Sequence, residues 1–257
     1  MRFDLQKASL SKRIPAWLLD TILLVVLVTA FAALLSTAFG YDNYNTQLKT
    51  AREKYEAEYN IDFEITQEDW EKLTGEEQEL YEKQSDEALK ALNADKEAVH
   101  AFNMVLSLSF AIPTLSILLA YLLLEFAVPL LFGNGQTLGK KVFNIALMRT
   151  DGVKVTTFMM FVRTILGKYT LETMIPVLIV LMLIFQMIGL TGTLVLVLFL
   201  LLQLGLLLFN RTRSVLHDLI ACTVAVDNAS QMMLDTPEAL LDYQKRVSAE
   251  RALHSDY

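Results

Sequence analysis

The sequence predicts an all-α membrane protein with four transmembrane helices, an outer helical hairpin and a small cytoplasmic β element. Hydrophobic residues make up 54% of the 257-residue chain. They form long blocks instead of recurring at the spacing of a soluble core. The charged residues lie between these blocks, and their signs differ from one connecting segment to the next. Block length and charge distribution together specify the spans and their orientation.

Each apolar block is long enough to cross a bilayer. A hydrocarbon layer of about 30 Å requires roughly 20 helical residues per crossing. The block 174–209 is nearly twice that length, and Gly189-Leu190-Thr191-Gly192 offers a tight turn near its middle. We therefore expect it to cross twice. The predicted spans are 14–39, 104–132, 174–190 and 193–209.

The distribution of Lys and Arg orients these spans, because cytoplasmic loops retain basic residues. The loop 40–103 carries seven basic and 17 acidic residues, a formal charge of −10, and is predicted to lie outside. The other 15 basic residues share one side only if 174–209 crosses twice, since a single crossing would place Arg211 and Arg213 outside. The termini, 1–13 and 210–257, are accordingly predicted to be cytoplasmic.

The outer loop 40–103 has a helix-forming composition with no proline. Thr74 and Glu77 form a capping-box pattern, which predicts a helix from there toward His100. An earlier helix is expected over about 44–59, with 60–66 as the connection. Its charge suits either binding of cations or a basic partner, or simply a solvated surface, and we favour the solvated surface.

The segment 133–173 has a different pattern. Two short apolar runs, 142–149 and 153–155, flank Thr150-Asp151-Gly152, and an Asp-Gly pair is typical of a hairpin turn. The stretch 156–168 is predicted to be a helix lying in the membrane interface. Residues 214–226 are too short to span and are expected to form a short helix and then a strand, 223–226.

Ionisable residues inside predicted spans are candidate functional sites, because inserting them costs several kcal/mol. Asp20 lies roughly 9 Å into the first span, and Glu125 roughly 10 Å from the cytoplasmic end of the second. Gln203 lies at a similar depth in the last span. With Tyr121, these residues form a candidate ion or proton path near the inner leaflet.

A polar stripe on the second span ends at Glu125 and indicates the same candidate path. Its members are spaced by four and seven residues: Asn103, Ser107, Thr114, Tyr121 and Glu125. The stripe could line a hydrated route, or its hydroxyl groups could bond back to their own helix while Glu125 is protonated or paired. Arg13 is two turns from Asp20 and is expected to meet a carboxylate such as Asp218 instead.

Other functional classes find little support. The segment Gly133 to Lys141 resembles a phosphate-binding loop superficially, but its spacing is wrong. No serine elbow or zinc motif is present, and the single Cys222 excludes a multi-cysteine site. We expect no enzymatic activity, no cofactor, no metal site and no nucleic-acid partner.

Three segments together resemble the RDD family of prokaryotic multi-pass membrane proteins. They cover the chain from about residue 10 to 227, in the family's order, with spans between them. The segments are Lys12-Arg13-Ile14-Pro15-Ala16-Trp17-Leu18-Leu19-Asp20; Gly135-Gln136-Thr137-Leu138-Gly139-Lys140-Lys141, continued by Arg149, Asp151-Gly152 and Arg163; and Leu216-His217-Asp218 through Val226.

The resemblance implies that Arg13, Asp20 and Asp218 are the defining residues. It also implies the plasma membrane as the location and transport of undefined ligands, with sodium–proton exchange proposed for some members. The expected partners are the lipid bilayer, a monovalent cation or proton, and a second copy or another protein. The alternative is an accessory or regulatory membrane protein that binds a partner through its outer helical loop.

Overall fold

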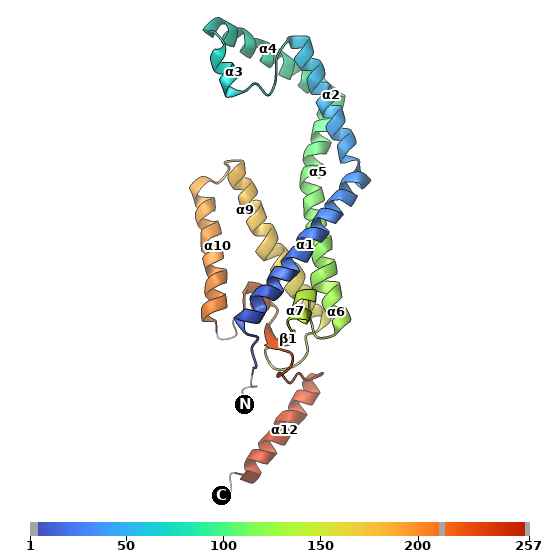
Figure 1. Cartoon of the computed structure of the whole chain (residues 1–257), viewed down its shortest axis with the longest axis vertical. Coiled ribbons are helices and arrows are strands. Elements are labelled where there is room, and N and C mark those ends of the chain that lie inside the picture. The colour runs from blue at the N-terminus through green and yellow to red at the C-terminus, as the bar shows by residue number, and fades with distance from the viewer. Residues whose placement is uncertain (1–4, 211–213, 255–257) are drawn as a thin grey trace. The chain divides into compact units, whose positions relative to one another are not determined.

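The computed structural model describes residues 5–210 and 214–254 and contains four helices long and apolar enough to cross a membrane (Figure 1). The predicted all-α membrane fold is confirmed. Contacts divide the chain into two compact units, one combining residues up to Val28 with those from Ile117 onward, the other Thr29–Ser116. The four spans are Leu10–Phe39, Lys96–Phe132, Thr157–Ile184 and Gly189–Phe209.

Two of the spans are built from several helical segments. The first is the single helix α1 (Leu10–Phe39) and the fourth is α10 (Gly189–Phe209). The second joins α5 (Lys96–Tyr121), the π-helix η1 (Leu122–Ala127) and α6 (Val128–Phe132). The third joins α8 (Thr157–Phe161), the π-helix η2 (Val162–Met174) and α9 (Ile175–Ile184).

The third span begins earlier than the sequence predicted. The stretch 156–168, expected to lie in the interface, is the first half of a continuous helix that ends at Ile184. Its basic residues suggested an interfacial position, but they are paired inside the protein. The turn to α10 falls at Phe185–Ile188, before the expected Gly189–Gly192. Arg211 and Arg213, used in the orientation argument, lie outside the described residues.

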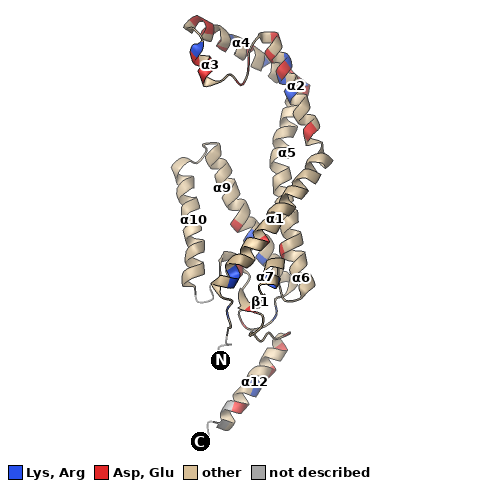
Figure 2. Cartoon of the chain, viewed as in Figure 1, with Lys and Arg blue, Asp and Glu red and all other residues tan. Residues whose placement is uncertain are grey.

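The loop 40–103, which is predicted to lie outside and which we call the outer unit, contains α2 (Tyr41–Tyr59), α3 (Gln67–Lys72) and α4 (Gly75–Ala94). Helix α2 packs against α4 as the predicted hairpin. Figure 2 shows charged residues along all three helices. The capping box is present, with the Thr74 amide donating to Glu77 Oε2 at 2.8 Å. The helix ends at Ala94, short of His100, because Asp95 accepts the first free amides of α5.

The small sheet pairs segments that are far apart in the sequence. Strand β1 (Ile145–Arg149) is antiparallel to β2 (Thr223–Asp227), with Ile145 opposite Asp227. The local hairpin expected between 142–149 and 153–155 is reduced to the bridge Met148–Lys154. Because β1 is buried on both faces, it needs a partner that is apolar on both faces, and β2 provides one.

Three short or terminal helices complete the fold. Helix α7 (Leu138–Val142) precedes β1, and α11 (Leu216–Ile220) precedes β2. Helix α12 (Pro237–His254) follows the sheet. The predicted short helix and strand within 214–226 are therefore confirmed.

Cysteine labelling will test the four-crossing topology. In a Cys222→Ser background, single cysteines replace Glu79 in α4, Met187 in the α9–α10 turn, or Glu250 in α12. All three positions are exposed. If 157–209 crosses twice, a membrane-impermeant maleimide added to intact cells labels the first two positions, and labels the third only after permeabilisation. Labelling of Met187→Cys only after permeabilisation would contradict the topology.

Candidate functional site

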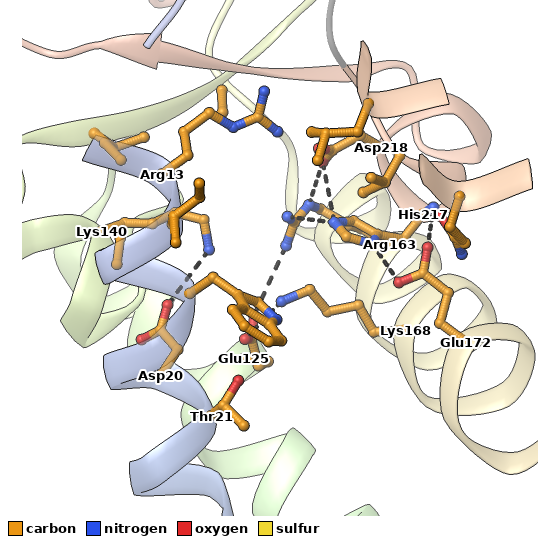
Figure 3. Close-up of a pocket in the computed structure, with 18 of the residues that line it drawn as sticks. Arg13, Asp20, Thr21, Glu125, Lys140, Arg163, Lys168, Glu172, His217 and Asp218 are labelled. Atoms are coloured by element: carbon orange, nitrogen blue, oxygen red, sulfur yellow. Dashed lines mark hydrogen bonds and ion pairs between the residues drawn. The ribbon is translucent and has the colours of Figure 1, made fainter. Parts of the chain in front are cut away.

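A cavity of about 460 Å³ lies in the unit that contains the termini, lined by residues of α1, η1, α7, η2, α10 and α11. Figure 3 shows Asp20 and Lys140 on one wall, Glu172 and His217 on the other, and Glu125 and Arg163 between them. We call it the charged cavity. Its charged lining residues are the basic Arg13, Lys140, Arg163 and Lys168 and the acidic Asp20, Glu125, Glu172 and Asp218.

Asp20 ties α1 to the start of α7. Its Oδ2 accepts a hydrogen bond from Thr137 Oγ1 at 2.5 Å, and its Oδ1 accepts one from the Gly139 amide at 2.7 Å. Lys140 Nζ is 3.8 Å from the same carboxylate. Asp20 thus satisfies an amide that the first turn of a helix leaves without an intrahelical partner. Both carboxylate oxygens of Asp20 therefore accept a hydrogen bond, and Lys140 compensates the charge.

Gly139 is the residue that allows this contact. A Cβ atom there would lie 2.2 Å from the Ala16 carbonyl oxygen and 2.9 Å from Asp20 Oδ1. No side chain fits, so α7 approaches the backbone of α1 through glycine alone. The spacing Thr137-Leu138-Gly139-Lys140 therefore combines a helix cap, a close approach and a basic partner for Asp20.

Burial strongly affects the basic side chain of this group. Lys140 lies outside the spans and its side chain is 12% exposed. Burial lowers the pKa of Lys140 to about 8, and the negative charge of Glu125 opposes that shift. Lys140 is therefore able to lose its proton close to physiological pH.

Glu125 is contacted by residues of the third span. Lys168 Nζ lies 2.6 Å from Glu125 Oε1, whereas Arg163 Nη1 lies 3.8 Å from Oε2. The Thr164 hydroxyl donates to the Glu125 carbonyl oxygen at 2.9 Å. The carboxylate is only 7% exposed, so its charge is compensated inside the protein.

The π-helical geometry of η2 places three charged residues on one face. Arg163, Lys168 and Glu172 are separated by five and four residues. In an α-helix with 3.6 residues per turn, Arg163 and Glu172 would point in opposite directions. A π-helix, with hydrogen bonds from i to i+5 and roughly 4.4 residues per turn, brings all three to the same side. All three line the charged cavity.

Arg163 is fully buried and joins the third span to α11. Its Nε donates to Asp218 Oδ1 at 2.8 Å, and its Nη2 is 2.9 Å from His217 Nε2. Burial alone would raise the pKa of Asp218, but the charge of Arg163 and its hydrogen bond hold it below the ordinary value. Asp218 is therefore a carboxylate at physiological pH.

His217 continues the network to Glu172. Its Nδ1 lies 2.6 Å from Glu172 Oε2, and its amide donates to Glu172 Oε1 at 3.0 Å. Burial lowers the pKa of His217, although Asp218 opposes this. A neutral ring with its proton on Nδ1 donates to Glu172 and accepts from Arg163 through Nε2. Gly167 permits the approach, since a Cβ there would lie 2.5 Å from His217 Cβ.

Two atoms of the cavity remain unsatisfied. Among the described residues, Glu125 Oε2 and Arg163 Nη1 are the buried side-chain atoms that have no hydrogen-bond partner. They face each other at 3.8 Å, which is within ion-pair range but too long for a hydrogen bond. It differs from the equally long Lys140–Asp20 pair in that both of its atoms are buried without a hydrogen bond.

The sequence-predicted site residues come together in this cavity. All six line it: Arg13, Asp20, Tyr121, Glu125, Gln203 and Asp218. Tyr121 is hydrogen-bonded to Thr173 at 2.9 Å, and Gln203 accepts from the Leu216 amide at 3.3 Å. That these residues carry ions stays a prediction.

One expectation about this site is extended and one requires correction. Arg13 lines the cavity and lowers the pKa of Asp218 through its charge, and Arg163, which was not expected there, donates a hydrogen bond to Asp218 at 2.8 Å. The polar stripe does not continue as one route. Thr114 donates back to the Phe110 carbonyl of its own helix, and of the stripe only Tyr121 and Glu125 line the cavity.

The sequence reasoning missed half of the charged lining. Lys168 and Glu172 were not among the predicted site residues, and Lys140 and Arg163 were noted only as parts of a motif. The spacing gave no signal, because Arg163 and Glu172 would lie on opposite sides of an α-helix.

Comparison with known proteins gives one match. The family model described as "RDD family" matches residues 7–222. No curated protein and no solved structure matches the chain.

Replacing Gly139 will test the α1–α7 approach. The Gly139→Ala variant is expected to lose about 1–3 kcal/mol of stability, because its methyl group overlaps a backbone oxygen. Thermal unfolding of the purified protein in detergent measures the loss. Gly75→Ala is the matched control, since a Cβ there meets nothing within 4 Å. Equal unfolding temperatures for the two variants would refute the close contact.

A double-mutant cycle will test whether Asp20 and Lys140 act as a pair. Asp20→Asn is expected to lower the unfolding temperature, because it leaves the Lys140 charge buried without its nearest carboxylate. Adding Lys140→Met should recover part of that loss, with a coupling energy of about 0.5 kcal/mol or more. Simple additivity of the two single losses would show that Asp20 acts through α7 alone.

Proposed function

Because the chain belongs to the RDD family, we propose that this membrane protein transports a small ion or polar solute and that the charged cavity is its substrate site. The observation that supports this proposal is the cavity itself, where eight charged side chains surround about 460 Å³ of space. Three of them, Arg163, Lys168 and Glu172, lie on a helix long and apolar enough to span. Charges in such positions are costly and mark ion or substrate pathways.

A purely structural role explains this arrangement less well. Two helices can be joined by one compensated ion pair, whereas the network here leaves Glu125 Oε2 and Arg163 Nη1 without hydrogen bonds. Unsatisfied buried atoms cost about 1–3 kcal/mol each. Both π-helices also carry cavity residues, and π-helical segments frequently occur at functional sites.

Monovalent cation exchange against protons is the first reaction to test. A cation that binds Glu125 competes with Lys168, which holds the same carboxylate at 2.6 Å. The added positive charge favours loss of a proton from a neighbouring lysine, and Lys140, with a pKa of about 8, is the candidate outside the spans. One cation would then enter as one proton leaves, and the total charge in the cavity would not change.

Asp20 has a different proposed role from Glu125. Its carboxylate accepts from Thr137 and Gly139 and faces Lys140, so we assign it to holding α7 in place. Glu125 has an oxygen without a hydrogen bond among the described residues and is the proposed substrate ligand. We place both termini in the cytoplasm of a prokaryotic plasma membrane, with the cavity on that side, and assign no enzymatic reaction.

An accessory role is the second candidate, and the outer unit supports it. Helices α2, α3 and α4 form a hairpin closed by its own contacts, such as the Asp62 amide donating to Tyr81 Oη at 2.7 Å. Its formal charge of −10 over 40–103 suits a basic partner. This role requires no flux through the cavity.

Flux in proteoliposomes separates the two roles. The parent protein is expected to exchange protons for sodium, potassium or lithium. Glu125→Gln is expected to abolish exchange, measured at a temperature where the variant, destabilised because it leaves the Lys168 charge uncompensated, is still folded. Glu79→Gln, an exposed change in α4, is the control and should retain full flux. Absence of flux with all three cations would refute cation exchange, and normal flux in Glu125→Gln would remove Glu125 from the site.

A further inference from the structure

The charge balance of the cavity limits what it can hold. Its lining has four basic and four acidic side chains, and the neutral His217 adds none. Unless a proton leaves the cavity in exchange, a ligand with a net charge adds an uncompensated charge among apolar helices, which is unfavourable. A ligand with both charges and a net charge of zero avoids this cost. The cavity is therefore better matched to a dipolar solute than to a bare ion.

The two unsatisfied atoms define where the charges of such a solute would go. Glu125 Oε2 can only accept a hydrogen bond, and Arg163 Nη1 can only donate. Within the described part of the chain neither has a hydrogen-bond partner, and 3.8 Å separates them. An ammonium group satisfies the first and an oxyanion satisfies the second. In a compact zwitterion these two groups are separated by a similar distance.

We propose that the charged cavity binds a compact zwitterion, with its ammonium group on Glu125 and its oxyanion on Arg163. This inference rests on the proposed function, because it names the substrate class of the same cavity. Binding inserts the ligand into the long Glu125–Arg163 contact. It leaves the short contacts of these residues, to Lys168 at 2.6 Å and to Asp218 at 2.8 Å, in place.

Singly charged ligands fit this position less completely. A bare cation satisfies Glu125 but brings a positive charge beside Arg163, Lys168 and Lys140. An anion satisfies Arg163 but brings a negative charge beside Glu125. Each leaves one of the two buried atoms without a hydrogen bond, and a hydrogen bond to a charged group is among the stronger ones.

The remaining walls indicate an apolar part in the ligand. Ile14, Trp17 and Leu24 of α1 line the cavity together with Leu207 of α10. Trp17 is 64% exposed, so its ring surface is available for contact. A volume of about 460 Å³ falls within the usual range for small-molecule sites. Two sources share this chemistry: an apolar amino acid and the headgroup region of an ethanolamine phospholipid.

Binding of matched probes to the purified full-length protein in detergent tests the inference. Leucine has both charges, leucinamide retains only the ammonium group, and N-acetylleucine retains only the carboxylate. Leucine is expected to bind about tenfold or more tightly than either analogue. Short-chain phosphatidylethanolamine, compared with phosphatidylglycerol, forms the lipid arm. Tighter binding of phosphatidylethanolamine in place of leucine would support the zwitterion and assign the lipid as its source.

Two variants locate the binding. Glu125→Gln should reduce affinity for the zwitterion to that for the carboxylate analogue, and Trp17→Ala should weaken every probe with an apolar body without disturbing the ion-pair network. The exposed Glu79→Gln change is the control. Equal affinity for a singly charged analogue, unchanged affinity in Glu125→Gln, or no binding of any probe would overturn the inference.

The same probes separate this inference from the proposed function. Cation–proton flux without binding of any zwitterion would overturn the inference and leave transport intact. Zwitterion binding that depends on Glu125, without cation–proton flux and without uptake of the bound probe into proteoliposomes, would support the inference and refute transport.

Discussion

The buried guanidinium of Arg163 is the group on which the charged cavity depends. It contacts Asp218 and His217 on α11 and faces Glu125 on the second span, so it joins two spans to the segment that precedes the sheet. Removing one partner of a buried ion pair costs about 3–5 kcal/mol, because the other charge is left uncompensated. The fixed, bifurcated geometry of a guanidinium suits this position, where one residue must bond in several directions at once.

Secondary structure and electrostatics depend on each other in the third span. Helix η2 brings Arg163, Lys168 and Glu172 into the cavity because its turn is wider than that of an α-helix. As α-helix, the same sequence would direct one of these charges toward lipid. The pairing of the charges stabilises the π-helix, and the π-helix makes the pairing geometrically feasible. The stretch 156–168, predicted to lie in the interface, continues into the apolar helix that ends at Ile184, because its charged residues are paired inside the protein.

Small residues determine how closely the charged segments approach. Gly139 lets α7 reach the backbone of α1, and Gly167 lets η2 reach His217. Both lie next to a cavity residue in space, so each supports a charge contact as well as a packing contact. Asp20 depends on the first approach: with a larger residue at position 139, its carboxylate could not accept from that amide. Asp20 thus acts as an interhelical cap, and Glu125 retains the unsatisfied oxygen.

The sequence by itself determined the all-α membrane class, the apolar segments long enough to cross a membrane, the acidic helical loop and the candidate residues Arg13, Asp20, Glu125 and Asp218. These features follow from hydrophobic length, net charge and local capping, which are properties of contiguous segments. Only the tertiary structure decided that Arg163 is the partner of Asp218, that β1 pairs with β2, and that η2 turns its charges inward. Each of these depends on a contact between segments tens of residues apart. Burial and charge compensation in the folded protein select such contacts, and no local sequence pattern specifies them.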